Sequence, residues 1–327
     1  MQTESDRDSG ADGHRAQDDP LIGQLLDGRF EIKAPVAAGG MGAVYRAEQR
    51  SMARDVAIKV LRTDRDADEH LTNRFLTEAR AASRLRNPHT ITVFDFGRSQ
   101  DGILYLVMEL LIGQTLGDEM RGGARLMELG RAAGIVGQVL DSLEEAHDVG
   151  VLHRDLKPDN IFMLETSGAR DFIKVLDFGV AKIVGESGMS ASSPGLVFGT
   201  PIYMSPEQMM GGEVDPRSDL YSLGVILFEL LAGRPPFVGD TALALARQKA
   251  RTAAPTLHDV NPSVRTTAVL DWLISRLLSP NPSDRPEDAA ECRSMLRAAV
   301  EADAPFSGAR GQTPTPGPSM KPPAEAT

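Results

Sequence analysis

The spacing of hydrophobic positions changes once along this 327-residue chain. In the first part, short apolar and β-branched runs alternate with polar turns, which predicts strands over residues 29–36, 43–47, 55–61, 91–96 and 103–108. A helical pattern over residues 70–86 interrupts these strands. From about residue 116 onward the spacing is mostly helical, which predicts helices over residues 126–146, 218–232, 241–250, 267–278 and 286–300.

This order of elements predicts an α+β fold with two lobes. A small antiparallel sheet with one main helix would occupy residues 30–108, and a larger, mainly helical lobe would occupy residues 109–298. The cleft between two such lobes is a place where nucleotide-sized ligands bind. The ends differ in composition: residues 1–25 are polar and acidic, residues 302–327 are rich in Pro, Gly, Ala and Thr, and we expect both to be disordered.

The composition argues against several classes of protein. A net charge of -11 and a pI of about 5.1 argue against general nucleic-acid binding, which requires a basic surface. The only cysteine, Cys292, cannot form an intrachain disulfide, and its helical context favours a buried, inert thiol over a reactive one. We find no basic-then-apolar signal sequence and no apolar run near the ~20 residues that cross a bilayer. We therefore expect a cytoplasmic protein without a membrane span.

The strongest chemical signal is a polar loop at residues 153–160, which reads His-Arg-Asp-Leu-Lys-Pro-Asp-Asn. Phosphoryl transfer requires a carboxylate, a cation and an amide oxygen of this kind. Asp155 can accept a hydroxyl proton, Lys157 can neutralise charge on a moving phosphoryl group, and the side-chain oxygen of Asn160 can hold a magnesium ion. A plain surface loop is the alternative, which the length and order of the pattern disfavour.

A glycine-rich turn precedes a strand lysine. Residues 36–44 read Val-Ala-Ala-Gly-Gly-Met-Gly-Ala-Val, and glycines allow the backbone to approach phosphates without a Cβ in the way. In the next strand, Lys59 is placed to meet the α- and β-phosphates of a nucleotide. Taken separately, an ordinary β-turn and an exposed strand lysine explain these two features about as well.

A second oxygen ligand follows the polar loop. Residues 177–179 read Asp-Phe-Gly, a sequence that carries little weight alone but much more at this distance from residues 153–160. The carboxylate of Asp177, together with the amide oxygen of Asn160 and phosphate oxygens, suits a hard octahedral ion. Mg²⁺ (or Mn²⁺) is therefore the expected metal.

Together these segments resemble bacterial eukaryotic-like (Hanks-type) serine/threonine protein kinases. The resemblance covers about residues 30–298 and keeps every segment in the family's order. Gly-Gly-Met-Gly-Ala-Val-Tyr after residue 38 and Tyr-Met-Ser-Pro-Glu-Gln at residues 203–208 are typical of these kinases, and Lys157 is the form seen in serine/threonine kinases. One departure is Ala37, which stands where the family has its first glycine; we expect this methyl group to be tolerated.

The resemblance implies a bilobal kinase fold that transfers the ATP γ-phosphate to Ser or Thr hydroxyls of proteins, with autophosphorylation. ATP and protein substrates are the implied partners, nucleic acid is not, and we also consider a kinase-domain dimer. By the same resemblance, Glu78 pairs with Lys59, Met108 is the gatekeeper, and the backbone of Glu109 and Leu111 binds the adenine edge. The implied nucleotide-binding set is Val36, Ala37, Gly39, Gly40, Gly42, Val44, Ala57, Lys59, Glu78, Met108, Glu109, Leu111 and Phe162.

Other polar residues gain roles from the resemblance. Thr200 is implied to bond Asp155 and Lys157 and so counts with Lys59 among the catalytic residues. Three further roles are structural: Glu207 pairs with Arg285, Asp219 clamps the backbone of the 153–160 loop, and His153 supports that loop. Trp272 is expected to be a core anchor.

Arg154 suggests control by a phosphoryl group that pairs with its guanidinium and orders the following loop. The candidate acceptors are Ser187, Ser190, Ser192 and Ser193, with a weak preference for Ser192 or Ser193. Two other functional classes stay open. A nucleotide-binding pseudokinase scaffold would lack a catalytic residue, and none is missing here; a small-molecule kinase would normally lack the Lys157 and Thr200 pattern.

Overall fold

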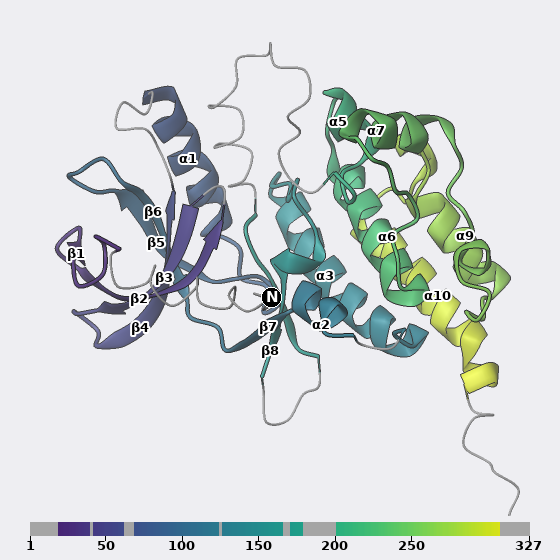
Figure 1. Ribbon diagram of the computed structural model, residues 1–327, viewed down its shortest axis with the longest axis horizontal. Helices are drawn as coiled ribbons and strands as arrows, with labels where there is room; N and C mark the ends of the chain where they lie inside the picture. The colour runs from purple at the N-terminus through teal and green to yellow at the C-terminus, as the bar shows by residue number, and fades with distance from the viewer. Residues whose placement is uncertain are drawn as a thin grey trace, which may run out of the picture.

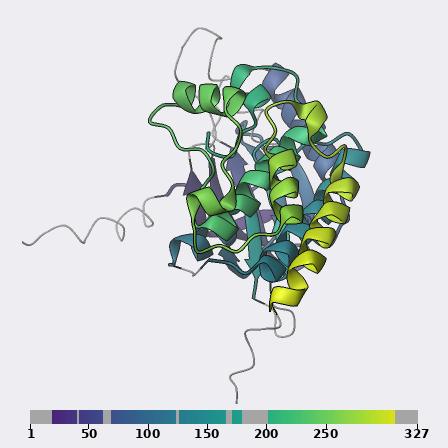
Figure 2. The ribbon, with the colours of Figure 1, turned by 90° about the vertical axis from the view of Figure 1, so that its right-hand side faces the viewer.

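The computed structural model describes residues 19–39, 42–61, 69–123, 126–165, 171–178 and 201–307, except for the side chains of residues 70, 71 and 305–307. It confirms the expected α+β fold of two lobes, with a curled antiparallel sheet on one side and packed helices on the other (Figure 1). After a 90° turn, the last helix is seen along the outer edge of the helical lobe (Figure 2).

The small lobe contains a six-stranded antiparallel sheet in the spatial order β1-β2-β3-β4-β6-β5. The two faces of β4 bury different side chains, because successive side chains of a strand point to opposite faces. Ile58 packs into a cluster with Phe30 and Tyr105, whereas Ala57 and Leu61 face the cleft and the helix. The strands are β1 (Leu25–Leu26), β2 (Phe30–Gly39), β3 (Gly42–Gln49), β4 (Arg54–Leu61), β5 (Val93–Arg98) and β6 (Leu104–Glu109).

One helix, α1 (Glu69–Ala82), covers the sheet and buries Phe75 and Ala79 against it. It ends four residues earlier than the predicted residue 86. The sequence continues to Asn87-Pro88, and the residue before a proline avoids the helical conformation. The carboxylate of Glu145, in the large lobe, accepts the backbone N–H groups of Arg86 and Asn87, which replaces the lost helical bonds.

The large lobe is built around α6 (Pro216–Ala232), which is buried along most of its length. Asp215 caps its first turn by accepting the N–H of Arg217, and Gly233 ends it in the left-handed conformation at φ 82°. Around it lie α2 (Leu116–Arg121), α3 (Leu129–Asp148), α5 (Pro206–Met210), α7 (Ala242–Arg251), α8 (Leu257–Val260), α9 (Ala268–Leu277) and α10 (Ala289–Ser307). The five predicted helices of this lobe are all present; α2, α5 and α8 were not predicted.

A small three-stranded sheet lies where the lobes meet (Figure 1). It consists of β7 (Gly113–Thr115), β8 (Ile161–Leu164) and β9 (Ile173–Val175), and a 3-10 turn, η1 (Pro158–Asn160), leads into β8. A parallel bridge from Thr90 to Val175 ties this sheet to the segment before β5. The sheet therefore carries the ends of the 153–160 loop and the start of residues 176–178.

Two expectations about single residues have opposite outcomes. Cys292 is 1% exposed, and burial raises the pKa of its thiol to about 12, which confirms a buried, inert thiol. Trp272 is 52% exposed, so the expected core anchor is wrong. Leu270, Leu273, Ile274 and Leu277 fill the buried face of α9, which turns the ring of Trp272 outward beneath the guanidinium of Arg276.

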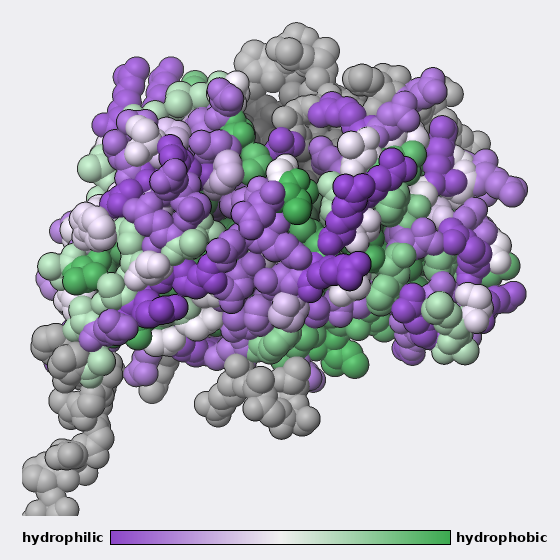
Figure 3. Space-filling view, turned by 180° about the vertical axis from the view of Figure 1, so that it is seen from behind, coloured by the Kyte–Doolittle hydropathy of each residue, from purple (hydrophilic) through white to green (hydrophobic). Residues whose placement is uncertain are grey.

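The outer surface is largely polar. In the view from behind, hydrophilic residues cover most of the visible face and hydrophobic residues form small, separate areas (Figure 3). Among the residues that the structure describes, none of the helices has the length and apolar character required to traverse a bilayer.

Candidate active site

Lys59 points into the cleft from β4. Its Nζ lies 2.8 Å from Oδ1 of Asp177, and the two side chains are 11% and 26% exposed. Burial pushes the pKa of Asp177 up, but the nearby ammonium of Lys59 outweighs this and holds the pKa below its ordinary value. The carboxylate is therefore kept ionised, which is the state that can bind a cation.

The backbone is strained at Asp177 and at Arg154 in the 153–160 loop. Asp177 has φ 59° and Arg154 has φ 64°, values in the left-handed region that residues with a Cβ rarely adopt. Such conformations cost about 1–3 kcal/mol each and persist where the surroundings impose them. Here the surroundings are identifiable: the backbone N–H of Arg154 is held by Asp219, and the carbonyl before Asp177 accepts from His153.

The 153–160 loop brings its polar groups together at one carboxylate. Oδ2 of Asp155 accepts Nζ of Lys157 at 2.8 Å and Nδ2 of Asn160 at 3.2 Å. Asn160 also donates Nδ2 to the backbone carbonyl of Asp155 at 2.7 Å. With its nitrogen turned to Asp155, the side chain of Asn160 presents its oxygen as the atom that can bind a metal ion.

Asn160 and Asp177 are connected through the backbone, because the N–H of Leu176 donates to the carbonyl of Asn160 at 2.8 Å. Both offer oxygen, the donor that magnesium prefers. Within the described part of the chain, no three or more His, Cys, Asp and Glu side chains gather to hold a metal. The side-chain oxygens of Asn160 and Asp177 are the candidate ligands for a hard cation.

The loop is clamped from below by Asp219, which is 1% exposed. Its carboxylate accepts the backbone N–H groups of His153 (2.9 Å) and Arg154 (2.8 Å) and Nε2 of His147 (2.8 Å). Burial raises the pKa of Asp219, but the bond from His147 and the other donors bring it below its ordinary value. The expected clamp is confirmed.

His153 has the supporting role that we expected. The side chain is fully buried, Nε2 lies 2.8 Å from the carbonyl oxygen of Leu176, and the ring packs 4.9 Å from the ring of Phe178. The imidazole therefore joins the loop to the segment that carries Asp177.

The expected pairing of Glu78 with Lys59 is wrong for this structure. Lys59 pairs with Asp177, and Oε1 of Glu78 lies 3.9 Å from the guanidinium of Arg154. No ion pair between the described side chains of Lys59 and Glu78 is present. The reason is the placement of α1, which directs Glu78 toward the 153–160 loop and leaves the nearer carboxylate of Asp177 for the ammonium.

Several residues expected around adenine lie in one apolar cluster. Ala57 and Met108 are buried directly opposite each other on β4 and β6, and Val44 and Leu111 pack against them. Leu176, which sequence reasoning missed, belongs to the same cluster. Val36 is different: in the second half of β2 it is 56% exposed and takes no part in this cluster.

The structure describes part of the glycine-rich turn, and it also describes Phe162, the expected nucleotide-binding residue on β8. Ala37 lies opposite Val44, and Gly39 lies opposite Gly42. A Cβ on Gly42 would collide with the carbonyl oxygen of Val60, so only glycine fits there. Phe162, on β8, lies opposite Thr115 and Lys174.

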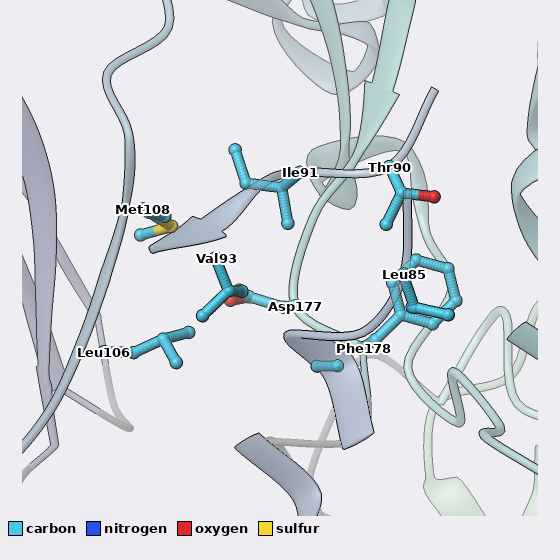
Figure 4. Close-up of a pocket in the computed structure, with 9 residues that line it drawn as sticks. Leu85, Thr90, Ile91, Val93, Leu106, Met108, Asp177 and Phe178 are labelled. Atoms are coloured by element: carbon cyan, nitrogen blue, oxygen red, sulfur yellow. The ribbon is translucent and has the colours of Figure 1, made fainter. Parts of the chain in front are cut away.

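Behind Met108 there is a cavity of about 10 Å³. Figure 4 shows side chains around it from β5, from β6 and from the segment between α1 and β5, together with Asp177 and Phe178. This volume is about that needed for one water molecule, and a nucleotide is far larger. A nucleotide therefore does not fit in this cavity.

Glu109 carries a contact that the sequence did not suggest. Its Oε1 accepts the backbone N–H of Thr92 at 2.7 Å and lies 2.8 Å from Nζ of Lys174, which is itself buried on β9. Lys174 also donates to the carbonyl of Thr90. These bonds fix the segment after β6 relative to the strand that leads to Asp177.

The predicted pair of Glu207 and Arg285 is confirmed. Two hydrogen bonds of 2.7 and 2.8 Å join the guanidinium to the carboxylate, and Ser218 donates a third to Glu207. Burial raises the pKa of Glu207, but Arg285 and Ser218 reverse this and lower it to about 2.

Some expected site residues cannot be placed. Gly40, Thr200 and the four candidate phosphorylation sites Ser187, Ser190, Ser192 and Ser193 lie outside the described residues.

Comparisons with known proteins agree with this geometry. The protein kinase domain family matches residues 30–297, which is more than half of the chain. The chain belongs to the protein kinase family. Among curated proteins, the serine/threonine-protein kinase Pkn3 of Myxococcus xanthus is 43% identical over 282 residues, covering 86% of this chain and 51% of that protein. PknB of Mycolicibacterium smegmatis is 38% identical over 288 residues, covering 86% and 44%.

A solved structure, the PknI kinase domain of Mycobacterium tuberculosis, aligns with a TM-score of 0.66 and 28% identity over 85% of this chain and 98% of that domain. Within the family, the chain resembles bacterial serine/threonine-protein kinases. It spans about half, or less, of the length of the first curated relatives.

Sequence reasoning missed several residues that organise this kinase site. His147 bonds Asp219, and Gln208 donates Nε2 to the backbone carbonyl of Arg154 at 2.8 Å. No local pattern distinguishes His147 from a solvated polar residue, whereas Gln208 ends the Tyr-Met-Ser-Pro-Glu-Gln motif, from which its contact with Arg154 was not predicted. Lys249 did carry a signal, since it follows Leu245 by four residues on the apolar face of a predicted helix.

Proposed function

We propose that this protein is an ATP-dependent serine/threonine protein kinase that phosphorylates Ser or Thr hydroxyls of other proteins. The observation that carries the proposal is the convergence of two groups in one cleft: Lys59 with Asp177, and Asp155 with Lys157 and Asn160. The match to serine/threonine-protein kinases over most of the chain supports it.

In the proposed reaction, Asp155 orients the acceptor hydroxyl and takes its proton as the oxygen attacks the γ-phosphorus of ATP. The bond from the γ-phosphorus to the β,γ-bridging oxygen then breaks, and ADP leaves. Lys157, held 2.8 Å from Asp155, lies where its ammonium can offset charge on the transferred phosphoryl group. Thr200 would complete this group by bonding Asp155 and Lys157.

The nucleotide would bind with adenine against the cluster of Ala57, Met108 and Leu111 and with the phosphates under the glycine turn and near Lys59. Asp177 and Asn160 would hold Mg²⁺, with Mn²⁺ as the alternative, and the bound ion would neutralise phosphate charge. When Asp177 binds the ion, the ammonium of Lys59 has to share the carboxylate of Asp177 with the ion or move away from it. We propose that Glu78 on α1 then becomes the ion-pair partner of Lys59.

The test is transfer of labelled phosphate from ATP to dephosphorylated casein and to the protein itself. Asp155→Asn keeps the size of the side chain but removes the base, and we expect transfer to fall at least about a hundredfold. Asp148→Asn, the same chemical change at an exposed position at the end of α3, serves as the matched control.

Equal transfer by the wild type and Asp155→Asn would exclude Asp155 as the base. Nucleotide binding without transfer by the wild type would instead favour the pseudokinase scaffold.

Three finer properties belong to the same proposal. The catalytic domain would span residues 30–298, in agreement with the family match over residues 30–297. It would act in the cytoplasm, where ATP is available.

Autophosphorylation between copies would require a transient kinase-domain dimer. Its initial rate would then rise with the square of protein concentration, whereas reaction within one chain would be first order.

A further inference from the structure

Lys249 is a buried cation that the reaction described above does not use. Its side chain is on α7 and is fully buried. Nζ donates to the backbone carbonyls of Pro201 (3.1 Å), Ile202 (2.6 Å) and Met204 (2.6 Å). An ammonium group has three N–H donors, so three converging carbonyls satisfy it completely, whereas a neutral amine would turn its lone pair toward one of these oxygens.

Among the described residues, no carboxylate forms an ion pair with Lys249. Glu207 on α5 attracts it from a distance but is bonded to Arg285, whose guanidinium stacks 4.9 Å from the ring of Tyr221. Tyr221, on α6, places the same ring 5.3 Å from Nζ of Lys249. Burial lowers the pKa of Lys249 to about 7, partly opposed by Glu207. The carbonyls of residues 201–204 are therefore its partners.

Residues 201–204 lie close in sequence to a contact with the 153–160 loop. They directly follow Thr200 and lead into α5, where Gln208 donates to the carbonyl of Arg154. Tyr203, in the middle of the segment, donates its hydroxyl to Glu229 on α6 at 2.7 Å. Figure 1 shows α5 and α7 side by side at the end of the helical lobe, so Lys249 reaches the segment from the neighbouring helix.

This segment forms turns and belongs to neither a helix nor a strand. Its carbonyls consequently have no regular ladder of backbone donors to fix their directions. A single side chain that binds three of them determines the course of the backbone between Thr200 and α5. The apolar cluster and the Lys59–Asp177 pair are formed by other elements and do not include Lys249.

We propose that Lys249 is a positioning residue for the protein acceptor: its ammonium holds residues 201–204 in the form against which the Ser- or Thr-bearing segment of a substrate docks. The inference rests on the proposed kinase function. It assigns to α7 an effect on acceptor binding that is separate from nucleotide binding.

The experiment uses the full chain with casein as the acceptor. Lys249→Met removes the three donors at similar volume, and Arg247→Met removes an exposed cation from the same helix as the matched control. Three quantities are measured: KM for casein, KM for ATP, and ATP hydrolysis without acceptor. In Lys249→Met we expect KM for casein to rise about tenfold, with the other two within about twofold of wild type. Arg247→Met should behave as wild type.

An unchanged KM for casein in Lys249→Met would overturn the proposal. So would a parallel loss of acceptor use, ATP use and thermal stability, since that would make Lys249 a residue of general stability. If the wild type transfers no phosphate at all, the proposed function fails first, and this outcome is distinct from both.

If Lys249→Met does not fold, Lys249→Gln and the wild-type pH profile keep the proposal testable. Gln retains two N–H donors without the charge, and KM for casein should again rise while KM for ATP does not. In the wild type, loss of the Lys249 proton above pH about 7 should raise KM for casein relative to KM for ATP. A flat ratio between pH 6 and about 9 would contradict the assignment.

Discussion

The pair of Arg285 with Glu207 and the pair of Lys59 with Asp177 are the same kind of contact in two regions of the molecule. In the large lobe, the guanidinium of Arg285 is 0% exposed and binds Glu207 through two hydrogen bonds. Its remaining N–H groups donate to the carbonyls of Ser279, Arg217 and Pro280. In the cleft, Lys59 makes one 2.8 Å contact with a carboxylate that is 26% exposed.

The difference between the two pairs lies in how many hydrogen bonds each partner makes. Every donor of Arg285 is used, so neither member of that pair can change partner without leaving a buried polar group unsatisfied. Asp177 keeps acceptor sites that a cation can occupy, and Lys59 can move to phosphates or to Glu78. We infer that the first pair fixes the fold and that the second is able to exchange partners during the proposed reaction.

The largest expected effect tests the fixed pair. Arg285→Met leaves the carboxylate of Glu207 buried without its partner, and we expect the free energy of unfolding to fall by about 3–5 kcal/mol. Equilibrium unfolding in urea measures this change. An effect below about 1 kcal/mol would mean that the pair is replaceable and that the comparison between the two regions is wrong.

Acid should weaken the same pair. The pKa of Glu207 is lowered from 4.5 to about 2, so its contribution to stability is present above pH 4.5 and is lost as the pH falls toward about 2. The shift corresponds to about 3 kcal/mol. Urea unfolding at several pH values should show this loss in the wild type. Glu207→Gln should be less stable at neutral pH and should lack this part of the pH dependence.

The exchangeable pair should affect activity far more than stability. Lys59→Met removes the cation that we propose binds phosphate, and we expect phosphate transfer to casein to fall at least about a hundredfold. The free energy of unfolding should change by less than about 1 kcal/mol, since active-site charges are seldom optimal for stability. Lys33→Met, which removes a surface lysine of β2, is the control for the assay. A large loss of stability in Lys59→Met alone would assign it a structural role.

The smallest expected effect concerns Trp272. Because the ring is 52% exposed, Trp272→Ser should change the free energy of unfolding by no more than about 0.5 kcal/mol. Thermal unfolding with Leu273→Ala, a fully buried neighbour, provides the contrast, for which we expect a loss of about 2–5 kcal/mol. Similar losses in the two variants would restore Trp272 as a core anchor.

Much of the fold could be predicted because it depends on local patterns. Hydrophobic periodicity located the main strands and helices, although α1 ended early where Asn87-Pro88 and Glu145 stopped it. Short elements such as β1, α2 and α8 escaped detection, since a few residues do not establish a period. The family resemblance also predicted two contacts between widely separated motifs, and both are confirmed. They are the pair of Glu207 with Arg285 and the bonds from Asp219 to the 153–160 loop.

The sequence by itself determined which chemical groups are present and in what order: the loop with Asp155, Lys157 and Asn160, the strand lysine, and Asp177. Only the tertiary structure decided which charges meet. It paired Lys59 with Asp177 instead of Glu78, turned Trp272 to solvent, and enclosed Lys249 among three carbonyls. Partner choice depends on distances and burial between distant segments, and a local pattern of residues contains neither.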